Sequence, residues 1–301
     1  MMSVTVIEVK GLSRRFNRVA ALDGLDFQVP AGSVTGFLGP NGAGKSTTIH
    51  ILMGLLRPHA GIVRVLGMDP IDDETAVRSR IGFVPEDPRG EPRFTVASQL
   101  AFLKAFRPSW DDGLTGELLD RLELDPAKPT RTLSRGQRAK LALVGALAFR
   151  PELLILDDPT SGLDPLARRE FMEGIIGMLA EEGRTVFFSS HQVDDIERVA
   201  DRVVLLHSGR CVYSASMDEL HAKWRLARLR FQGDAPAVVQ LPGLRRWECD
   251  GREGRAVFDD AGEAGEAGEA ALRRMQVEWE WLPFTLEDIY VELVRHPEVR
   301  P

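Results

Sequence analysis

The segment from Gly39 to Thr47 has the residue types and the spacing of a loop that binds phosphate. It reads Gly39-Pro40-Asn41-Gly42-Ala43-Gly44-Lys45-Ser46-Thr47, which satisfies the pattern of a glycine, four residues, a glycine, a lysine and a hydroxyl residue. Glycines let consecutive backbone N–H groups face an anion, and a following helix adds its positive dipole end. Lys45 supplies a mobile charge, and the Ser46 hydroxyl is a ligand for Mg²⁺. A plain glycine turn is disfavoured because a strand-like segment, Val34–Leu38, leads into the loop.

Two adjacent carboxylates follow a second apolar segment. Leu153–Leu156 is continuously apolar and predicts a buried strand, and Asp157 and Asp158 come directly after it. Carboxylates at the end of a buried strand are costly unless they meet a cation or a proton donor. We therefore interpret this pair as belonging to a metal site rather than as surface acids.

Two further polar residues, Glu86 and His191, also follow predicted strands. Glu86 comes after Ile81–Pro85, and His191 comes shortly after Thr185–Phe188. Ligands of open α/β sheets bind at the carboxyl ends of strands, so both side chains are placed for ligand contact. The structural alternatives are a solvated turn for Glu86 and an ordinary hydrogen-bonding role for His191.

Two features outside these strand ends could also bind a nucleotide. Ser134 is a natural N-cap for a helix over 135–149, and with Gly136 and Gln137 this helix start could bind phosphate, although alone it would be only a cap. Phe16 could stack on a purine ring or belong to the core, and the residues alone favour neither alternative.

The segments that would position these residues alternate between strand and helix patterns, which predicts an α/β core. Between about 87 and 150 the pattern is helical and indicates an inserted helical subdomain. Further strands are predicted at Val4–Val9, Leu25–Val29, Ile62–Leu66 and Val203–Leu206, and helices at Ser46–Leu56, Val96–Phe106, Leu114–Leu122 and Arg135–Phe149.

The character of the chain changes near residue 222. We predict a first domain over 1–221 and a small α+β accessory domain over 222–301. In the accessory domain, Val277–Trp281 is typical of a strand and Thr285–Val294 of a helix capped by Thr285. The repeated Ala-Gly-Glu triplets of Ala261–Ala270 favour a flexible surface connection.

Composition excludes several classes of protein. The chain has 301 residues and a net charge of −7, without the basic excess of a dedicated nucleic-acid binder. Its two cysteines, Cys211 and Cys249, are too few for a disulfide framework and suit a reducing cytoplasm. No apolar run approaches the ~20 residues that span a bilayer, and the start lacks a signal-peptide pattern. A link to a membrane is therefore expected through a partner.

Taken in order, these motifs resemble the nucleotide-binding subunit of ATP-binding cassette (ABC) transporters over roughly residues 4–220. This resemblance implies a P-loop NTPase fold with a mixed sheet core and an inserted helical subdomain. The tail, Phe284–Tyr290, is more loosely similar to the C-terminal extension of bacterial drug, antibiotic, sodium or polysaccharide exporters. The motifs are Phe16, the phosphate loop, Glu86, Leu133-Ser134-Arg135-Gly136-Gln137, Asp157, Ser161-Gly162-Leu163-Asp164 and His191.

The resemblance also implies a head-to-tail dimer in which each ATP lies between the phosphate loop of one chain and the signature helix of the other. Phosphoryl transfer needs mostly positioning and charge neutralisation, which such a site supplies. The implied roles are adenine stacking by Phe16, phosphate binding by Gly39–Thr47, Mg²⁺ binding by Ser46, Glu86 and Asp157, and γ-phosphate contacts by Ser134, Gly136 and Gln137 of the opposite chain. His191 would act as the sensor of the γ-phosphate, and Lys45, Glu86, Asp158 and His191 would have catalytic roles.

Three positions depart from the family pattern. Arg135 replaces a glycine, which is tolerable if its side chain points away from the phosphate. Glu86 stands where glutamine is usual, so an amide donor is lost and a negative charge is added. Asp158 stands where a glutamate normally polarises the attacking water. Because aspartate is one methylene shorter, hydrolysis is expected to be slow.

We expect from the resemblance an ATPase subunit of an exporter, bound to membrane permease subunits at the cytoplasmic face and paired with a second cassette, in a homodimer. The permease is expected to dock near Glu86 and the helical subdomain. One alternative is an ATP-gated switch with very slow hydrolysis. The other is a cassette ATPase that acts on nucleic acid or ribosomes, but such proteins usually carry two cassettes, coiled-coil insertions or basic segments, which this sequence lacks. No nucleic-acid partner is therefore expected.

Overall fold

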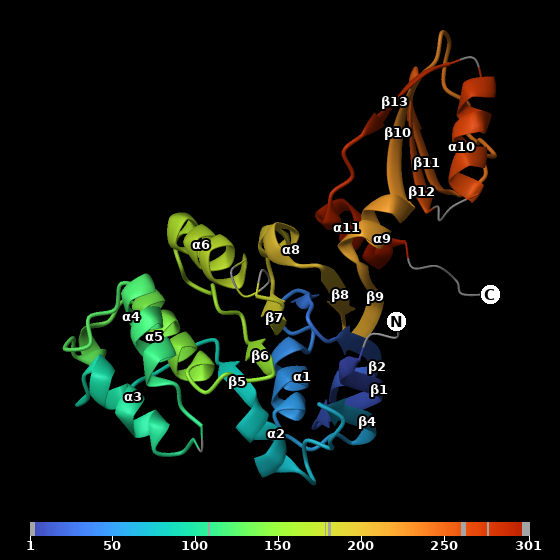
Figure 1. The fold of residues 1–301 in the computed structure, drawn as a ribbon. Helices are drawn as coiled ribbons and strands as arrows, with labels where there is room; N and C mark the ends of the chain where they lie inside the picture. The colour runs from blue at the N-terminus through green and yellow to red at the C-terminus, as the bar shows by residue number, and fades with distance from the viewer. Residues whose placement is uncertain are drawn as a thin grey trace. The chain divides into compact units, whose positions relative to one another are not determined.

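The computed structural model describes residues 4–107, 109–177, 179, 182–259, 263–275 and 277–296 (Figure 1). The chain divides into two compact units between Ser214 and Ala215. The first unit contains two sheets and a group of helices, and the second contains one sheet with its own helices.

A six-stranded sheet in the order β5-β6-β7-β3-β8-β9 forms the centre of the first unit. The pairs β5/β6, β6/β7, β7/β3 and β3/β8 are all parallel. Parallel neighbours end at the same edge of a sheet, so the segments that follow β6, β7 and β3 meet there. The strands are β3 (Val34–Leu38), β5 (Ile81–Val84), β6 (Leu153–Leu156), β7 (Thr185–Ser190), β8 (Arg202–His207) and β9 (Arg210–Ser216).

An antiparallel sheet, ordered β2-β1-β4, packs against this sheet through the main hydrophobic core. Its strands are β1 (Thr5–Phe16), β2 (Val19–Pro30) and β4 (Ala60–Val65). The rings of Phe27, Phe37 and Phe187 lie 5.2–5.7 Å apart in the core. Strand β1 is longer than the sequence predicted because irregular register beyond Val9 interrupts the alternation of apolar and polar residues.

The helical subdomain follows β5, and the three helices predicted for it are confirmed with small changes at their ends. Both α3 and α5 start in capping boxes, formed by Thr95 with Ser98 and by Ser134 with Gln137. Helix α2 (Glu74–Arg80) precedes β5. The elements of the subdomain are α3 (Val96–Lys104), α4 (Asp112–Arg121), the short 3₁₀ turn η1 (Thr130–Thr132) and α5 (Arg135–Leu147).

Further helical elements among the described residues of the first unit lie around the sheet. Helix α1 (Lys45–Leu52) follows the phosphate loop and is shorter than predicted. The segment α6 (Pro165–Phe171) continues as a π-helical turn, η2 (Met172–Ile176). Helix α8 (Val193–Val199) follows β7 and places Ile196 against Gly36 of β3.

The second unit is an antiparallel sheet ordered β11-β12-β10-β13, with α10 lying along it in Figure 1. The prediction of a flexible connection is wrong from Glu263 onward, and residues 261–262 lie outside the described residues. Tertiary packing orders the segment: Leu272 is fully buried and Gly268 lies close to the ring of Phe258. The elements are α9 (Met217–Lys223), β10 (Trp224–Arg230), β11 (Leu244–Asp250), β12 (Glu253–Asp259), α10 (Glu263–Arg274), β13 (Glu278–Leu282) and α11 (Leu286–Arg295).

Candidate nucleotide site

The phosphate loop is a tight turn between β3 and α1. Gly44 has φ +111°, and a β-carbon there would lie 2.6 Å from Leu22 Cδ2 and 2.7 Å from the carbonyl oxygen of Ala21. Only glycine fits this conformation and this close approach. The loop leads directly from β3 into the N-terminus of α1, which is the strand–loop–helix order that the sequence predicted.

Lys45 is folded back over the loop that precedes it. Its side-chain nitrogen donates hydrogen bonds to the carbonyl oxygens of Gly39 at 2.7 Å and Pro40 at 3.1 Å. Burial lowers the pKa of Lys45, and the negative charges of three carboxylates, Asp158, Asp157 and Glu86, oppose that lowering. The lysine thus lies within the field of all three predicted acidic residues.

Asp157 joins the phosphate loop to the end of β7. Its Oδ1 atom accepts hydrogen bonds from Ser46 Oγ at 3.2 Å and from Ser189 Oγ at 2.8 Å. The sequence predicted Ser46 and Asp157 as a pair but missed Ser189. The only indication of Ser189 in the sequence is that it is a hydroxyl residue at the end of the strand that leads to His191.

The oxygen atoms of Ser46 and Asp157 fit Mg²⁺, which prefers oxygen ligands and usually takes only one or two from protein, with phosphates and water completing its shell. Among the described residues there is no cluster of three or more His, Cys, Asp or Glu side chains that could hold a metal without such help. Glu86 does not hydrogen-bond to either residue. Its Oε1 instead accepts a hydrogen bond from Ser161 Oγ at 3.2 Å.

Asp158 is buried at the end of β6 and paired with His191. Asp158 Oδ2 and His191 Nδ1 are 2.6 Å apart, and the Asp158 backbone N–H donates to Ser189 Oγ at 2.9 Å. Burial raises the pKa of Asp158, and the hydrogen bond from His191 partly offsets that rise. The second oxygen, Oδ1, is buried and has no hydrogen-bond partner among the described residues. The carboxylate therefore has one buried oxygen that makes no hydrogen bond with the described residues.

A second polar cluster, formed by Asp195, Thr160 and Ser190, was not predicted from the sequence. Asp195 of α8 is 1% exposed, and its Oδ2 accepts hydrogen bonds from Thr160 Oγ1 at 2.7 Å and Ser190 Oγ at 3.1 Å. It links the segment after Asp158 to the residue before His191. An acidic residue in a helix with acidic neighbours carries no sequence signal for such a role.

Phe16 does not belong to the core. The side chain is 45% exposed at the end of β1, and the Arg14 guanidinium lies 4.9 Å from the centre of its ring. The core alternative is therefore excluded, and an aromatic face is left at the surface.

The start of α5 is held by its own capping box and by a contact with Gly162. Ser134 Oγ accepts from the Gln137 N–H at 3.2 Å, and Gln137 Oε1 accepts from the Ser134 N–H at 3.2 Å. The Arg135 guanidinium packs onto Gly162, where an added β-carbon would lie 2.7 Å from Arg135 Cζ. Within the described parts of the chain, no hydrogen bond joins Ser134, Gly136 or Gln137 to the phosphate loop.

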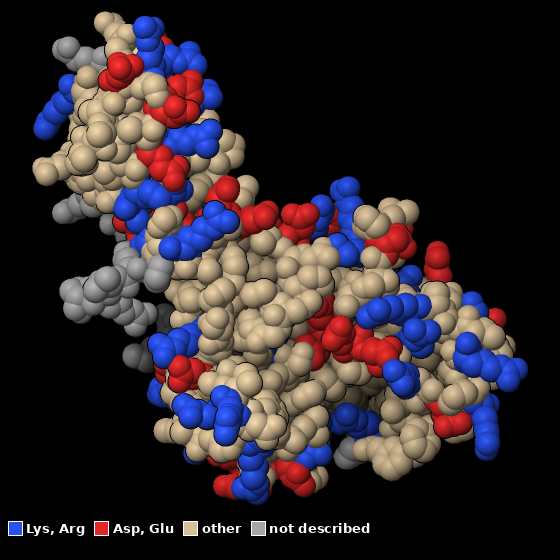
Figure 2. Space-filling view, turned by 180° about the vertical axis from the view of Figure 1, so that it is seen from behind, with Lys and Arg blue, Asp and Glu red and all other residues tan. Residues whose placement is uncertain are grey.

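Basic side chains do not form a continuous face on the side of the molecule that Figure 2 shows. Figure 2 shows positive and negative side chains interspersed over that side of both units. We also find no helix in the described ranges that is long and apolar enough to cross a bilayer.

The sequence and the fold match known proteins. A family model described as ABC transporter matches residues 22–161. The daunorubicin resistance ATP-binding protein DrrA3 of Streptomyces coeruleorubidus is 34% identical over 97% of this chain and 96% of its own. The energy-coupling factor transporter ATP-binding protein EcfA2 of Symbiobacterium thermophilum is 40% identical over 73% of this chain and 80% of its own. A solved ATP-binding subunit of an ABC transporter superposes with a TM-score of 0.65 at 29% identity, covering 72% of this chain and 92% of its own.

Proposed function

The chain belongs to the ABC transporter family of ATP-binding proteins, and from this we propose that it is the ATP-hydrolysing subunit of an exporter. ABC ATP-binding domains are ATPases. The observation that carries the proposal for this chain is the hydrogen bond that Ser46 of the phosphate loop donates to Asp157 at the end of β6. This bond joins a hydroxyl to a carboxylate at one edge of the sheet, and Lys45 lies within the field of the same carboxylate. A magnesium nucleotide requires these three groups.

In the proposed site, Gly39–Thr47 binds the phosphates and Lys45 neutralises part of their charge. Ser46 and Asp157 hold Mg²⁺, with Glu86 close enough to influence the same region through its charge. The metal would supply charge neutralisation on the phosphate oxygens. The exposed ring of Phe16 stacks on adenine.

Asp158 acts in this proposal as the general base, and His191 orients it. The 2.6 Å contact holds one carboxylate oxygen, and the unpartnered Oδ1 remains to accept a proton from water. The short aspartate side chain limits its reach, so we propose slow turnover. This feature also favours the second candidate function, an ATP-gated switch that barely hydrolyses ATP.

We further propose that ATP closes a head-to-tail dimer of two cassettes. The separation of the α5 start from the phosphate loop of the same chain supports this arrangement, because Ser134, Gly136 and Gln137 remain to contact the γ-phosphate held by a second copy. Hydrolysis would reopen the dimer and drive separate permease subunits at the cytoplasmic face of the membrane. The match to a drug-resistance protein over almost the whole chain, including the accessory unit, supports export as the direction.

Phosphate release from MgATP by the purified full chain, alone and with a co-expressed permease, tests this proposal. Turnover above that of an Asp158→Asn variant supports the ATPase, and ATP-dependent dimerisation without turnover supports the switch. Absence of both ATP binding and dimerisation would overturn the proposal. Binding to RNA or DNA that weakens steeply with salt would instead favour a nucleic-acid function.

A further inference from the structure

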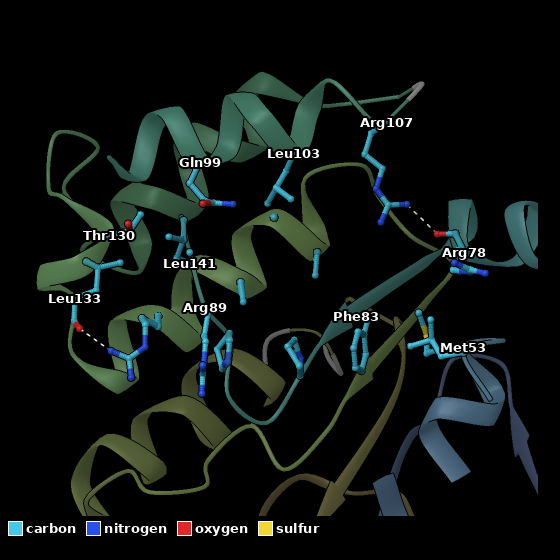
Figure 3. Close-up of a pocket in the computed structure, with 18 residues that line it drawn as sticks. Met53, Arg78, Phe83, Arg89, Gln99, Leu103, Arg107, Thr130, Leu133 and Leu141 are labelled. Carbon is cyan, nitrogen blue, oxygen red and sulfur yellow. Dashed lines mark hydrogen bonds between the residues drawn. The ribbon is translucent and has the colours of Figure 1, made fainter. Parts of the chain in front are cut away.

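The accessory unit has a cavity of about 320 Å³ where β10 begins and β13 ends. Helix α9, these two strands and the segment after β13 contribute to it. It shares no lining residue with the larger groove beside the helical subdomain, which Figure 3 shows and where the permease is expected to dock. The residues that line the cavity are His221, Trp224, Arg225, Trp281, Leu282 and Phe284.

Aromatic rings that are already held by packing form the walls of this cavity. The ring centres of Trp224 and Phe284 lie 6.4 Å apart, and Trp224 is buried. The ring of Trp281 lies edge to face with two others, with its centre 5.3 Å from that of Trp279 and 5.8 Å from that of Phe258. Rings that are fixed in this way lose little conformational entropy when a flat ligand stacks on them.

The polar side chains of the cavity are basic. Arg225 and His221 line it, and no Asp or Glu is among its described lining residues. The Arg225 guanidinium lies 5.5 Å from the ring centre of Trp281, so the cation is held beside an aromatic wall. A ligand that stacks in the cavity therefore meets a positive charge at its edge.

Arg225 differs from the other two arginines of β10, which are both paired with carboxylates. Arg228 pairs with Glu280, and Arg230 pairs with Glu253 at 3.3 Å. Among the described residues, the Arg225 side chain forms neither a salt bridge nor a hydrogen bond, and its contact is with the ring of Trp281. Its guanidinium can therefore donate two parallel hydrogen bonds to an incoming carboxylate.

A second arginine, Arg245, lies against a wall of the cavity but is neutralised within the unit. Its guanidinium lies 5.1 Å from the ring centre of Trp224. It forms salt bridges with Asp259 at 3.3 Å and with Glu292 at 3.6 Å. Arg245 therefore helps to fix the ring of Trp224, and Arg225 is the arginine that can bind an anionic ligand.

We propose that this cavity binds a small planar aromatic carboxylate. The rings of the ligand stack on the aromatic walls, and its carboxylate accepts hydrogen bonds from Arg225. The volume of about 320 Å³ is at the lower end of the range for small-molecule pockets, roughly 300–1,000 Å³, which fits a ligand with one or two rings. Every lining residue belongs to the accessory unit, so the inference does not depend on the proposed ATPase.

Isothermal titration calorimetry of the full chain with four matched probes tests this ligand class. Naphthoate is a planar aromatic anion, naphthamide has the same rings without the charge, naphthylmethylammonium is an aromatic cation, and decalin carboxylate is an anion without a flat ring. Naphthoate should bind about tenfold more tightly than each of the other three. Its advantage over naphthamide should shrink as salt is raised, because the site is open to solvent.

Variants of the protein place the binding in this cavity. Arg225→Gln should abolish the preference for naphthoate over naphthamide, and Arg225→Glu should reverse it in favour of naphthylmethylammonium. Arg230→Gln is the matched control, because Arg230 lies on the same strand but does not line the cavity. Phe284→Leu should reduce the preference for naphthoate over decalin carboxylate, and Phe284 is outside the core cluster of the unit. Circular dichroism of each variant checks its fold.

Three results would overturn the inference: equal affinity for naphthoate and naphthamide, a preference for naphthoate that persists in Arg225→Gln, or no binding of any probe at millimolar concentration. Sedimentation without ATP tests a second copy of the chain as the occupant. Self-association that Arg225→Gln abolishes would assign the cavity to that copy and would also overturn the inference. ATP binding is measured on the same preparations, and its absence beside an intact preference for naphthoate would count only against the proposed function.

Discussion

His191 Nδ1 lies 2.6 Å from Asp158 Oδ2, so a residue that follows β7 holds a carboxylate that follows β6. Asp158 also has a positive φ of 43°, a conformation that aspartate adopts more readily than most residues. Backbone and side chain thus fix one oxygen on the histidine. The other oxygen is buried without a partner in the described structure. The proposed general base therefore has one oxygen fixed by His191 and one oxygen without a hydrogen bond.

Lengthening this side chain should speed up the reaction. We expect Asp158→Glu to raise kcat by about tenfold, because the added methylene extends the reach of the base. The same variant should lower thermal stability, since glutamate is less tolerant of the positive φ at this position. Steady-state phosphate release and a thermal melt measure the two effects. An unchanged or lower kcat would show that reach does not limit turnover.

The ionisation of Asp158 should also make stability depend on pH. Burial is the main cause that raises its pKa in the folded chain, so the folded state binds the proton more tightly than the unfolded state. Its contribution to stability is therefore present below the ordinary pKa of aspartate and is lost as pH rises through the folded pKa. Without nucleotide and with EDTA, Asp158→Asn should be more stable than the parent at neutral pH. The difference should disappear at low pH.

Denaturant unfolding at a series of pH values measures this effect. Asp194→Asn is a matched control for the substitution, because Asp194 is an exposed aspartate on α8. A parent protein that stays as stable as Asp158→Asn through the neutral range would contradict the expected sign.

Candidate site residues that lie in one continuous segment were predictable from the sequence, and those that come together across the sheet were not. The phosphate loop is a single continuous segment, and Asp157 is marked by the apolar strand before it. Ser189 meets Asp157 only because β6 and β7 are neighbours in the sheet. Likewise, Thr160 and Asp195 are separated by 35 positions and are joined only by folding. No local pattern reports such pairs.

Packing also overrode composition in the accessory unit. The glycine-rich triplets of 261–270 predict a flexible segment, but from Glu263 the chain is helical, with Leu272 buried in the core beneath it. Gly268 allows this helix to approach Phe258 closely. The sequence could not reveal this approach, because it depends on a strand that itself was not predicted.

Removing the Ser46 hydroxyl should weaken the metal site more than the nucleotide site. We expect Ser46→Ala to raise the Mg²⁺ concentration needed for half-maximal hydrolysis by about tenfold or more. Ser189→Ala should raise it by a smaller factor, because Ser189 acts only through its hydrogen bonds with Asp157 and with the Asp158 backbone. Affinity for ATP measured in EDTA should change little. Ser79→Ala, on the exposed face of α2, is the control. Equal Mg²⁺ dependence in Ser46→Ala and the control would contradict the proposed ligand.

Asp195 should support the site through its hydrogen bonds with Thr160 and Ser190. Asp195→Ala leaves the buried Thr160 hydroxyl without its acceptor, which costs about 1–3 kcal/mol of unfolding free energy. Because Thr160 follows Asp158 closely and Ser190 precedes His191, kcat should fall while KM for ATP stays nearly constant. The exposed neighbour Asp194 gives the matched variant Asp194→Ala. Loss of stability with an unchanged kcat would restrict Asp195 to a structural role.

Gly162 should be intolerant of any side chain for two separable reasons. Its φ is +69°, which strains any L side chain, and an added methyl group would displace the guanidinium of Arg135, a movement that a flexible side chain makes at lower cost. We expect Gly162→Ala to destabilise the chain and to weaken ATP-dependent dimerisation, since this turn and the start of α5 lie together. In a Gly162→Ala/Arg135→Gly double variant the collision is relieved but the backbone strain remains, so recovery should be partial.

Sedimentation with and without MgATP, together with thermal melts, separates these contributions. Gly174→Ala is the control, because a β-carbon at Gly174 would meet no other atom within 4 Å and its backbone φ is not positive. Alanine is also favoured over glycine in a helical backbone, so this variant should be at least as stable as the parent. Full recovery in the double variant would assign the whole effect to Arg135. No recovery would assign it to the backbone alone, and would mean that the contact between Arg135 and Gly162 contributes nothing to the arrangement of the turn.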